Sequence, residues 1–172
     1  MSSNYENNKV SKVIHRNKRR SHADKKFYVA LPNLPLFGQI KNLDLLKKLL
    51  EIIEDEATAV DFYTRLLFDA PNSLHKEFIE EAKDEEAKHL IVFTKLYQLL
   101  TNQIPSYTLT PVNYANYKEG LLIALKDELE AADLYKEMIL STNDARIKDA
   151  FFYAMGDELE HSVMFSTLYN TV

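Results

Sequence analysis

The chain has 172 residues, of which 46% are hydrophobic and 27% are charged, a balance typical of a globular domain rather than a disordered chain. It contains no cysteine, which excludes disulfides, thiolate-bound zinc and iron–sulfur centres and is consistent with a reducing, cytoplasmic location. Its three glycines and five prolines are too few for a turn-rich all-β protein, no apolar run is long enough to span a membrane, and the N-terminus lacks the apolar stretch of a signal peptide.

The net charge of −5 is unevenly distributed along the chain. Residues 1–26 carry eight lysines and arginines against two acidic residues, which gives +6 and leaves −11 for the remainder. This basic stretch is also rich in asparagine and serine, a composition typical of solvated segments. We therefore expect a basic, disordered arm ahead of an acidic body.

Residues 27–41 form a second region, which begins with the apolar sequence FYVALPNLPLFGQI. Pro32, Pro35 and Gly38 interrupt it and disfavour a helix. We expect an extended segment that packs along the body or onto a partner.

Residues 42–172 are expected to form one all-α domain, because four long stretches show the helical spacing of apolar residues. The helices are predicted from about Leu45 to Leu67, from Ser73 as N-cap to Leu100, from about Tyr114 to Leu140, and from Asn143 or Asp144 onward. The positions predicted to face inward are Leu45, Leu49, Ile52, Glu56, Ala59, Tyr63, Leu66; Phe78, Ala82, Glu86, His89, Phe93, Leu96; Tyr117, Leu121, Ala124, Glu128, Ala131, Tyr135, Met138; and Phe151, Ala154, Glu158, His161, Phe165, Leu168.

The lengths of the connections predict the topology. The first and third connections are short, so each should join an antiparallel helix hairpin. The sixteen residues 101–116 can extend over ~53 Å, whereas a helix of roughly 25 residues is ~38 Å long. This connection can therefore cross the whole bundle, which predicts two antiparallel hairpins joined by a long crossover.

An internal repeat with a spacing of 72 residues is the strongest signal for function. It relates Glu56, Tyr63, Glu86, His89 and Phe93 to Glu128, Tyr135, Glu158, His161 and Phe165. In each set a glutamate on one helix is followed by Glu-x-x-His on the next, and residues at i and i+3 project from one helical face. Four carboxylates and two imidazoles therefore face the interior.

An ionised carboxylate at a core position is costly unless it is paired or bound to metal. Four such carboxylates carry −4, which two divalent cations would balance. Oxygen and imidazole donors suit iron or manganese. We therefore predict two iron ions, or alternatively manganese or a mixed pair, bound by Glu56, Glu86, His89, Glu128, Glu158 and His161.

The residues around this set are assigned lesser roles. Tyr63 and Tyr135 are expected to hydrogen-bond ligand carboxylates, and Phe93 and Phe165 to form walls of the site. We assign to solvated faces the acidic residues Glu54, Asp55, Glu81, Asp84, Glu85, Asp127, Glu130, Asp157 and Glu160. His15, His22 and His75 have no partner that the sequence identifies.

The doubled Glu…Glu-x-x-His motif resembles the rubrerythrin branch of the ferritin-like superfamily over about residues 42–170. The resemblance implies a ferritin-like four-helix bundle with a di-iron centre that reduces peroxide, and often a homodimer. It also implies that Glu86 and Glu158 bridge the metals, that Glu56 and His89 complete one, and that Glu128 and His161 complete the other.

The chain departs from rubrerythrins in two ways. It has no cysteine for a rubredoxin domain, so peroxide reduction would require an external electron donor. In addition, Leu125 stands where rubrerythrins carry a further glutamate, one turn before the ligand on the third helix.

Three functions stay open at this point. The first is an oxidoreductase acting on hydrogen peroxide or dioxygen. The second is a ferritin-like protein that oxidises or stores iron in a shell-forming oligomer. The third is a protein that binds DNA or another partner through the basic arm, with an affinity that falls as salt rises.

Overall fold

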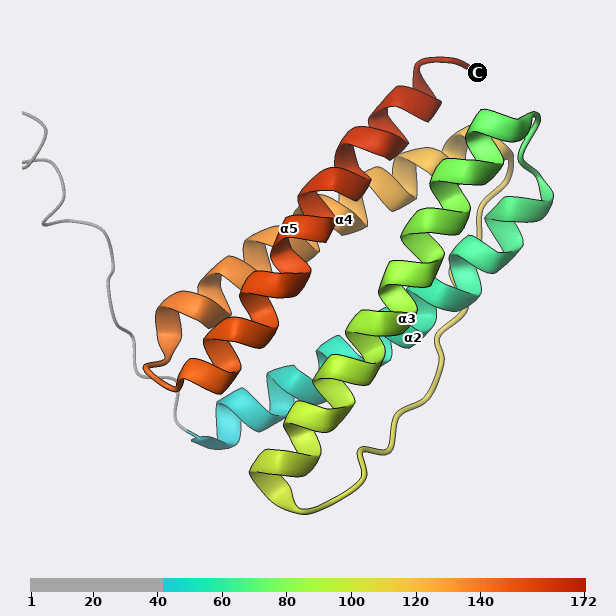
Figure 1. The fold of residues 1–172 in the computed structure, drawn as a ribbon. Helices are drawn as coiled ribbons and strands as arrows, with labels where there is room; N and C mark the ends of the chain where they lie inside the picture. Colours follow the sequence, from blue (N-terminus) through green and yellow to red (C-terminus); the bar gives the residue numbers. More distant parts are fainter. Residues whose placement is uncertain (1–41) are drawn as a thin grey trace, which may run out of the picture. The chain divides into compact units, whose positions relative to one another are not determined.

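The computed structural model of the protein describes residues 42–172. The predictions for the basic arm and for residues 27–41 lie outside this range. The described residues form four α-helices: α2 (Asn42–Phe68), α3 (Ser73–Thr101), α4 (Tyr117–Ser141) and α5 (Ala145–Tyr169). The predicted all-α four-helix bundle is thus confirmed (Figure 1). None of the four helices combines the length and the apolar character that a transmembrane span requires.

Side-chain caps set the helix starts, and two of them differ from the prediction. Asn72, not Ser73, caps α3, because its side chain accepts the backbone N–H of His75. The fourth helix starts after Asp144, one of the two predicted residues. α4 begins at Tyr117 rather than near Tyr114, after a cap at Asn116.

The start of α4 is a reciprocal capping arrangement. Asn116 accepts the backbone N–H of Glu119, and the Glu119 carboxylate accepts the backbone N–H of Ala115 at 2.6 Å. This satisfies one free backbone donor in the first turn of the helix and one just before the cap. The apolar periodicity extends past this point, but the cap decides where the helix begins.

The helices form two antiparallel hairpins. α2 packs against α3 and α4 packs against α5, and the two hairpins meet mainly where α3 contacts α5. In Figure 1, α3 and α5 form the front layer and α2 and α4 the rear layer. The segment between α3 and α4 runs along the bundle beside α2. Arg65 on α2 holds it by donating to the carbonyl of Val112 at 2.8 Å.

Two apolar clusters fill the two ends of the bundle. One includes Leu49, Phe93 and Phe151, and the other includes Phe62, Leu121 and Phe165. These side chains are essentially fully buried, and burying each one contributes about 1.5–3 kcal/mol to folding before entropy is counted. The predicted metal ligands lie between the two clusters, in the middle of the bundle.

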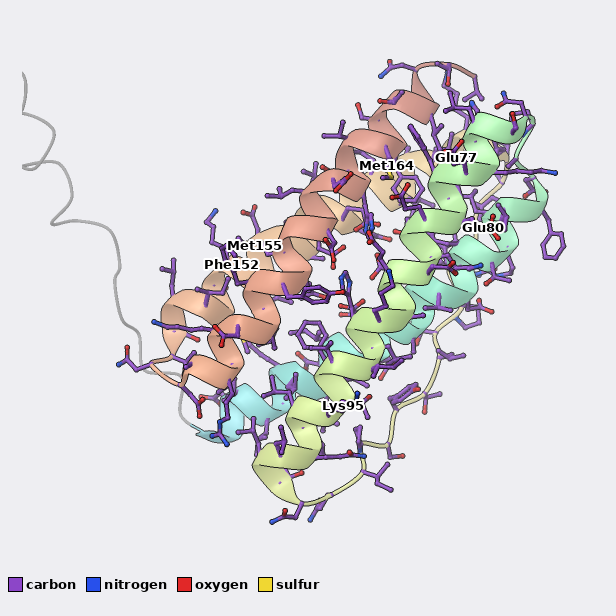
Figure 2. The ribbon with its side chains drawn as sticks, in the orientation of Figure 1. Glu77, Glu80, Lys95, Phe152, Met155 and Met164 are labelled. Atoms are coloured by element: carbon purple, nitrogen blue, oxygen red, sulfur yellow. The ribbon has the colours of Figure 1, made fainter. Side chains whose placement is uncertain are left out.

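The outer surface distinguishes the two hairpins. On α5, Phe152 and Val163 are 68% and 66% exposed. The equivalent position to Phe152 in the other hairpin is Glu80 on α3, and Figure 2 shows both residues on their helices. The repeat is therefore not kept at this exposed position, whereas the position of Val163 is matched on α3 by Ile91, which is 52% exposed.

Candidate metal centre

Each helix contributes one glutamate to the interior of the bundle. Glu56, Glu86, Glu128 and Glu158 are between 1% and 3% exposed, and within residues 44–172 no other carboxylate is buried to this degree. His89 and His161 are fully buried beside them. The apolar periodicity of each helix places these polar residues inside, since they occupy the positions that face the core.

The six side chains form two overlapping groups. One group consists of Glu56, Glu86, His89 and Glu158, and its ligand atoms all lie within 4.8 Å of one another. In the other group, Glu128 and His161 join the same Glu86 and Glu158 within the same limit. Glu86 and Glu158 are therefore common to both groups, whereas each of the other four residues belongs to one.

The Nδ1 atoms of both histidines face the shared carboxylates. His89 Nδ1 lies 3.2 Å from oxygens of both Glu86 and Glu158. His161 Nδ1 lies 3.2 Å from Glu86 and 3.4 Å from Glu158. The two imidazole rings are 6.3 Å apart between centroids. The imidazoles thus flank one cluster of carboxylates.

The opposite ring nitrogen of each histidine contacts an acidic residue of the other hairpin. His89 Nε2 lies 3.0 Å from Asp157, and His161 Nε2 lies 3.0 Å from Glu85. A carboxylate that accepts the Nε2 proton fixes the ring orientation and leaves Nδ1 free to bind a metal. Glu85 and Asp157 were expected on solvated faces, which is wrong, because their side chains are only 23% and 24% exposed and contact the histidines. They are a pair in the 72-residue repeat, directly before Glu86 and Glu158, and that pairing is the signal that could have identified them.

Replacing Glu85 or Asp157 with alanine should weaken metal binding by roughly 10- to 100-fold, because the histidine loses the group that orients its ring. Metal titration of the purified variants would measure this change. Glu81→Ala and Glu160→Ala are matched controls, since both acidic residues are exposed on the same two helices. Affinities equal to those of the controls would show that Glu85 and Asp157 do not position the histidines.

Two tyrosines also form hydrogen bonds from one hairpin to the other. Tyr63 on α2 donates to Glu128 on α4 at 2.5 Å, and Tyr135 on α4 donates to Glu56 on α2. Each tyrosine therefore bonds the glutamate of the opposite hairpin rather than the one on its own helix. Burial, aided by the nearby carboxylates, raises the pKa of both tyrosines well above 10, so they stay protonated donors.

Phe93 and Phe165 form walls behind these tyrosines. The Phe93 ring lies 5.4 Å from Tyr135, and the Phe165 ring lies 4.9 Å from Tyr63, measured between centroids. Both phenylalanines are fully buried. Their contacts restrict the tyrosine rings to the rotamers that reach the carboxylates.

The four buried glutamates have different proton affinities. Burial, reinforced by the charge of Glu86, raises the pKa of both Glu56 and Glu128 well above the ordinary value. Burial alone would also raise the pKa of Glu86 and Glu158, but close contacts with His161 and His89 lower it. The two shared glutamates therefore favour the ionised form, whereas the two unshared ones hold a proton more readily than an ordinary glutamate does.

The histidines balance the shared carboxylates. Burial alone would lower the pKa of His89 and His161, but close contacts with the surrounding glutamates raise it. These shifts favour charged imidazoles beside ionised Glu86 and Glu158, with protons held at Glu56 and Glu128.

Loading the centre with two divalent ions should release more than one and up to about four protons per chain, since the ligands must be deprotonated to bind. Two protons would come from Glu56 and Glu128, and two from the imidazolium groups. Calorimetric titration in buffers of different ionisation enthalpy would count them. A release of one proton or none would show that the cluster does not carry these protons.

Several donor atoms of the cluster lack hydrogen-bond partners within it, whereas their arrangement suits metal ions. Oε2 of Glu56, both carboxylate oxygens of Glu158 and Nδ1 of His161 are buried and have a histidine or glutamate atom 3.2–3.7 Å away, but none of them has a partner in hydrogen-bond geometry. Buried polar atoms normally have a partner, and each unpaired atom costs about 1–3 kcal/mol. Oxygen and imidazole donors that converge in this way suit iron or manganese.

A cavity of about 340 Å³ opens on the side of the glutamates that lies away from the histidines. It lies between α2 and α4, and all four buried glutamates line it, whereas neither histidine does. Asp55 and Asp127, another pair in the repeat, line it near the surface.

Burial and the neighbouring Glu54 raise the pKa of Asp55 to about 6. Burial, then Glu130 and Asp55, raise the pKa of Asp127 to about 6.

His75 is the third buried histidine of the described residues, and it lies apart from the centre. Its Nδ1 bonds the hydroxyl of Tyr117 at 2.8 Å, and its Nε2 bonds Thr171 at 3.1 Å. Burial lowers its pKa. His75 thus connects the start of α3 to the start of α4 and to the residues after α5. His15 and His22 lie outside the described residues.

Comparison with known proteins identifies one relative. YhjR of Bacillus subtilis (strain 168), described as uncharacterized, is 31% identical over 121 residues, which cover 70% of this chain and 83% of YhjR. The chain belongs to the YhjR family. No protein-family model matches the chain, and no solved structure matches it. Membership of the YhjR family assigns no activity to the chain, and the buried cluster is the feature that bears on function.

Proposed function

We propose that this member of the YhjR family is a dinuclear metal oxidoreductase. It would hold two iron or manganese ions, act on hydrogen peroxide or dioxygen, and take its electrons from an external donor, as the resemblance to rubrerythrins implies. The observation that carries the proposal is the pair of overlapping ligand groups that share Glu86 and Glu158.

The donor set supports a redox role over a structural one. Structural zinc sites are closed, with four ligands that are mostly cysteine or histidine. Here the cluster is rich in carboxylates and is open to a cavity on one side. Two divalent ions of this kind, when bound, supply two electrons to an O–O bond and Lewis acidity to its oxygens.

The surrounding residues would perform three tasks. Glu86 and Glu158 would hold both ions, while Glu56 with His89 and Glu128 with His161 would each complete one. Tyr63 and Tyr135 would fix the unshared carboxylates through their hydroxyl groups. The cavity between α2 and α4 would admit the oxidant, and the apolar clusters at both ends of the bundle would exclude bulk water.

Metal analysis followed by an anaerobic peroxide titration would test this proposal. We expect about two metal ions per chain after reconstitution with iron(II) or manganese(II). About one peroxide per chain should then oxidise both ions, because each peroxide accepts two electrons. Metal content well below one ion per chain, or peroxide consumption no faster than that of the free metal ion, would refute the proposal.

A further inference from the structure

The cavity beside the glutamates is larger than a peroxide or dioxygen site requires. Its volume is about 340 Å³, whereas a water molecule occupies ~30 Å³ in the liquid and each oxidant has only two heavy atoms. Pockets that hold small organic ligands begin at roughly 300 Å³. The space is therefore sufficient for an organic molecule beside the metal centre.

The walls of the cavity are apolar, and two small residues create the room. Ile52, Phe62 and Leu134 line it together with Ala59 and Ala131. The two alanines are a pair in the 72-residue repeat, one on α2 and one on α4. Both were expected to be buried in the core but are only half-buried, because they face this cavity. A larger side chain at either position would fill the space.

The outer part of the cavity is acidic. Asp55, Asp127 and Glu130 line it, and none of the lysines and arginines among the described residues does. All three acidic side chains are exposed, so they can meet a ligand that enters from solvent. Thr58 adds a polar atom on the wall, since its hydroxyl is buried without a hydrogen-bond partner.

We infer that this cavity binds a small organic cation, an amine with an apolar body. The ammonium group lies at Asp55 and Asp127, and the apolar body lies between Ala59 and Ala131 with its far end toward the glutamates. A hydrated metal ion that entered here would use the acidic residues but gain nothing from the apolar walls. The binding of the amine does not depend on the proposed function.

Calorimetry with matched six-carbon probes would test the inference. Hexylammonium, hexanol and hexanoate would be titrated into the full-length protein after its metal content has been measured. We expect hexylammonium to bind at least about fivefold more tightly than hexanol, because two carboxylates face its charge. Hexanoate should bind more weakly than hexanol, since like charges repel.

Variants of the walls and of the acidic residues separate the two parts of the inference. Ala59→Leu and Ala131→Leu should each weaken hexylammonium binding about tenfold or more, because the added side chain occupies the cavity. Metal content should be unchanged in both. The double variant Asp55→Asn/Asp127→Asn should weaken hexylammonium about fivefold but leave hexanol unchanged. Ala145→Leu and Glu77→Gln are the matched controls, since both residues are exposed and neither lines the cavity (Figure 2 shows Glu77).

Several outcomes would overturn the inference while leaving the proposed function intact. The first is that the protein holds two metal ions but binds none of the probes. The second is that hexanoate binds as tightly as hexylammonium. The third is that the leucine variants bind hexylammonium as tightly as the controls do. A protein that binds hexylammonium but retains no metal would refute the proposed function instead. Circular dichroism would show whether each leucine variant is folded. If a leucine variant does not fold, the asparagine variant provides the test.

Discussion

Replacing Glu86 or Glu158 with alanine should remove both metal ions, whereas replacing Glu56 should remove only one. The reason is that Glu86 and Glu158 belong to both ligand groups, so either substitution takes a donor from each metal. Glu56 belongs to one group, and its loss leaves Glu86, Glu128, Glu158 and His161 in place.

Metal content after reconstitution and dialysis would measure this difference. We expect about two ions per chain in the wild type, about one in Glu56→Ala, and close to none in Glu86→Ala. Glu128→Ala should match Glu56→Ala, because the 72-residue repeat makes the two positions equivalent. Glu77→Ala, on the exposed face of α3, controls for the loss of an acidic residue.

Chemical denaturation should accompany the metal measurement, because each alanine leaves a cavity in the bundle and the variants have to be shown to fold. The isosteric substitutions Glu86→Gln and Glu56→Gln keep the shape of the side chain and lose one charge. Equal metal loss in the Glu56, Glu86 and Glu158 variants would contradict the assignment of Glu86 and Glu158 as shared ligands.

The metal-free protein should lose stability as pH rises from about 6 to 8. The folded-state pKa values of Glu56 and Glu128 lie above those of an unfolded chain, chiefly because of burial. The folded-state pKa values of His89 and His161 are also raised, because close contacts with the glutamates outweigh burial. In this pH range the folded protein therefore binds more protons than the unfolded chain does.

The sign of the pH dependence follows from these shifts. Stabilisation by a group with a raised pKa is complete below the unfolded value and is lost as pH rises through the folded value. Glu86 and Glu158, whose pKa values are lowered, act in the opposite sense, but only below about pH 4.5. Each proton that differs between the two states contributes about 1.4 kcal/mol per pH unit. We expect a loss of at least about 2 kcal/mol over the range.

Urea unfolding at several pH values, with a chelator present, would test this expectation. Glu56→Gln should have a shallower pH dependence, because glutamine does not titrate. With metal in excess the trend should reverse, since metal binding strengthens as its ligands lose their protons. A metal-free protein whose stability is constant or increases between pH 6 and 8 would contradict the proton arrangement described for the cluster.

The sequence by itself determined the helices and the residues that face the interior. The spacing of apolar residues predicted four helices and two hairpins, and the structure confirms the bundle. The 72-residue repeat also predicted that six polar residues face the interior, and all six lie together in the structure. Such a prediction is feasible because helical periodicity is a local property that fixes which face of each helix is buried.

The ends of the helices were less well determined by the apolar pattern. α4 begins at Tyr117 rather than near Tyr114, and Asn72 rather than Ser73 caps α3. The backbone donors at a helix start can be satisfied by any of several nearby polar side chains. Apolar periodicity carries no information about which of these side chains is used.

Only the tertiary structure decided which residues of one hairpin meet those of the other. His89 contacts Asp157 and Tyr63 bonds Glu128, and both contacts cross between hairpins. The same arrangement separates α2 from α4 enough to leave the cavity lined by Ala59 and Ala131. Periodicity specifies the direction of a side chain relative to its own helix axis, whereas these contacts depend on the rotation and separation of neighbouring helices, which packing sets.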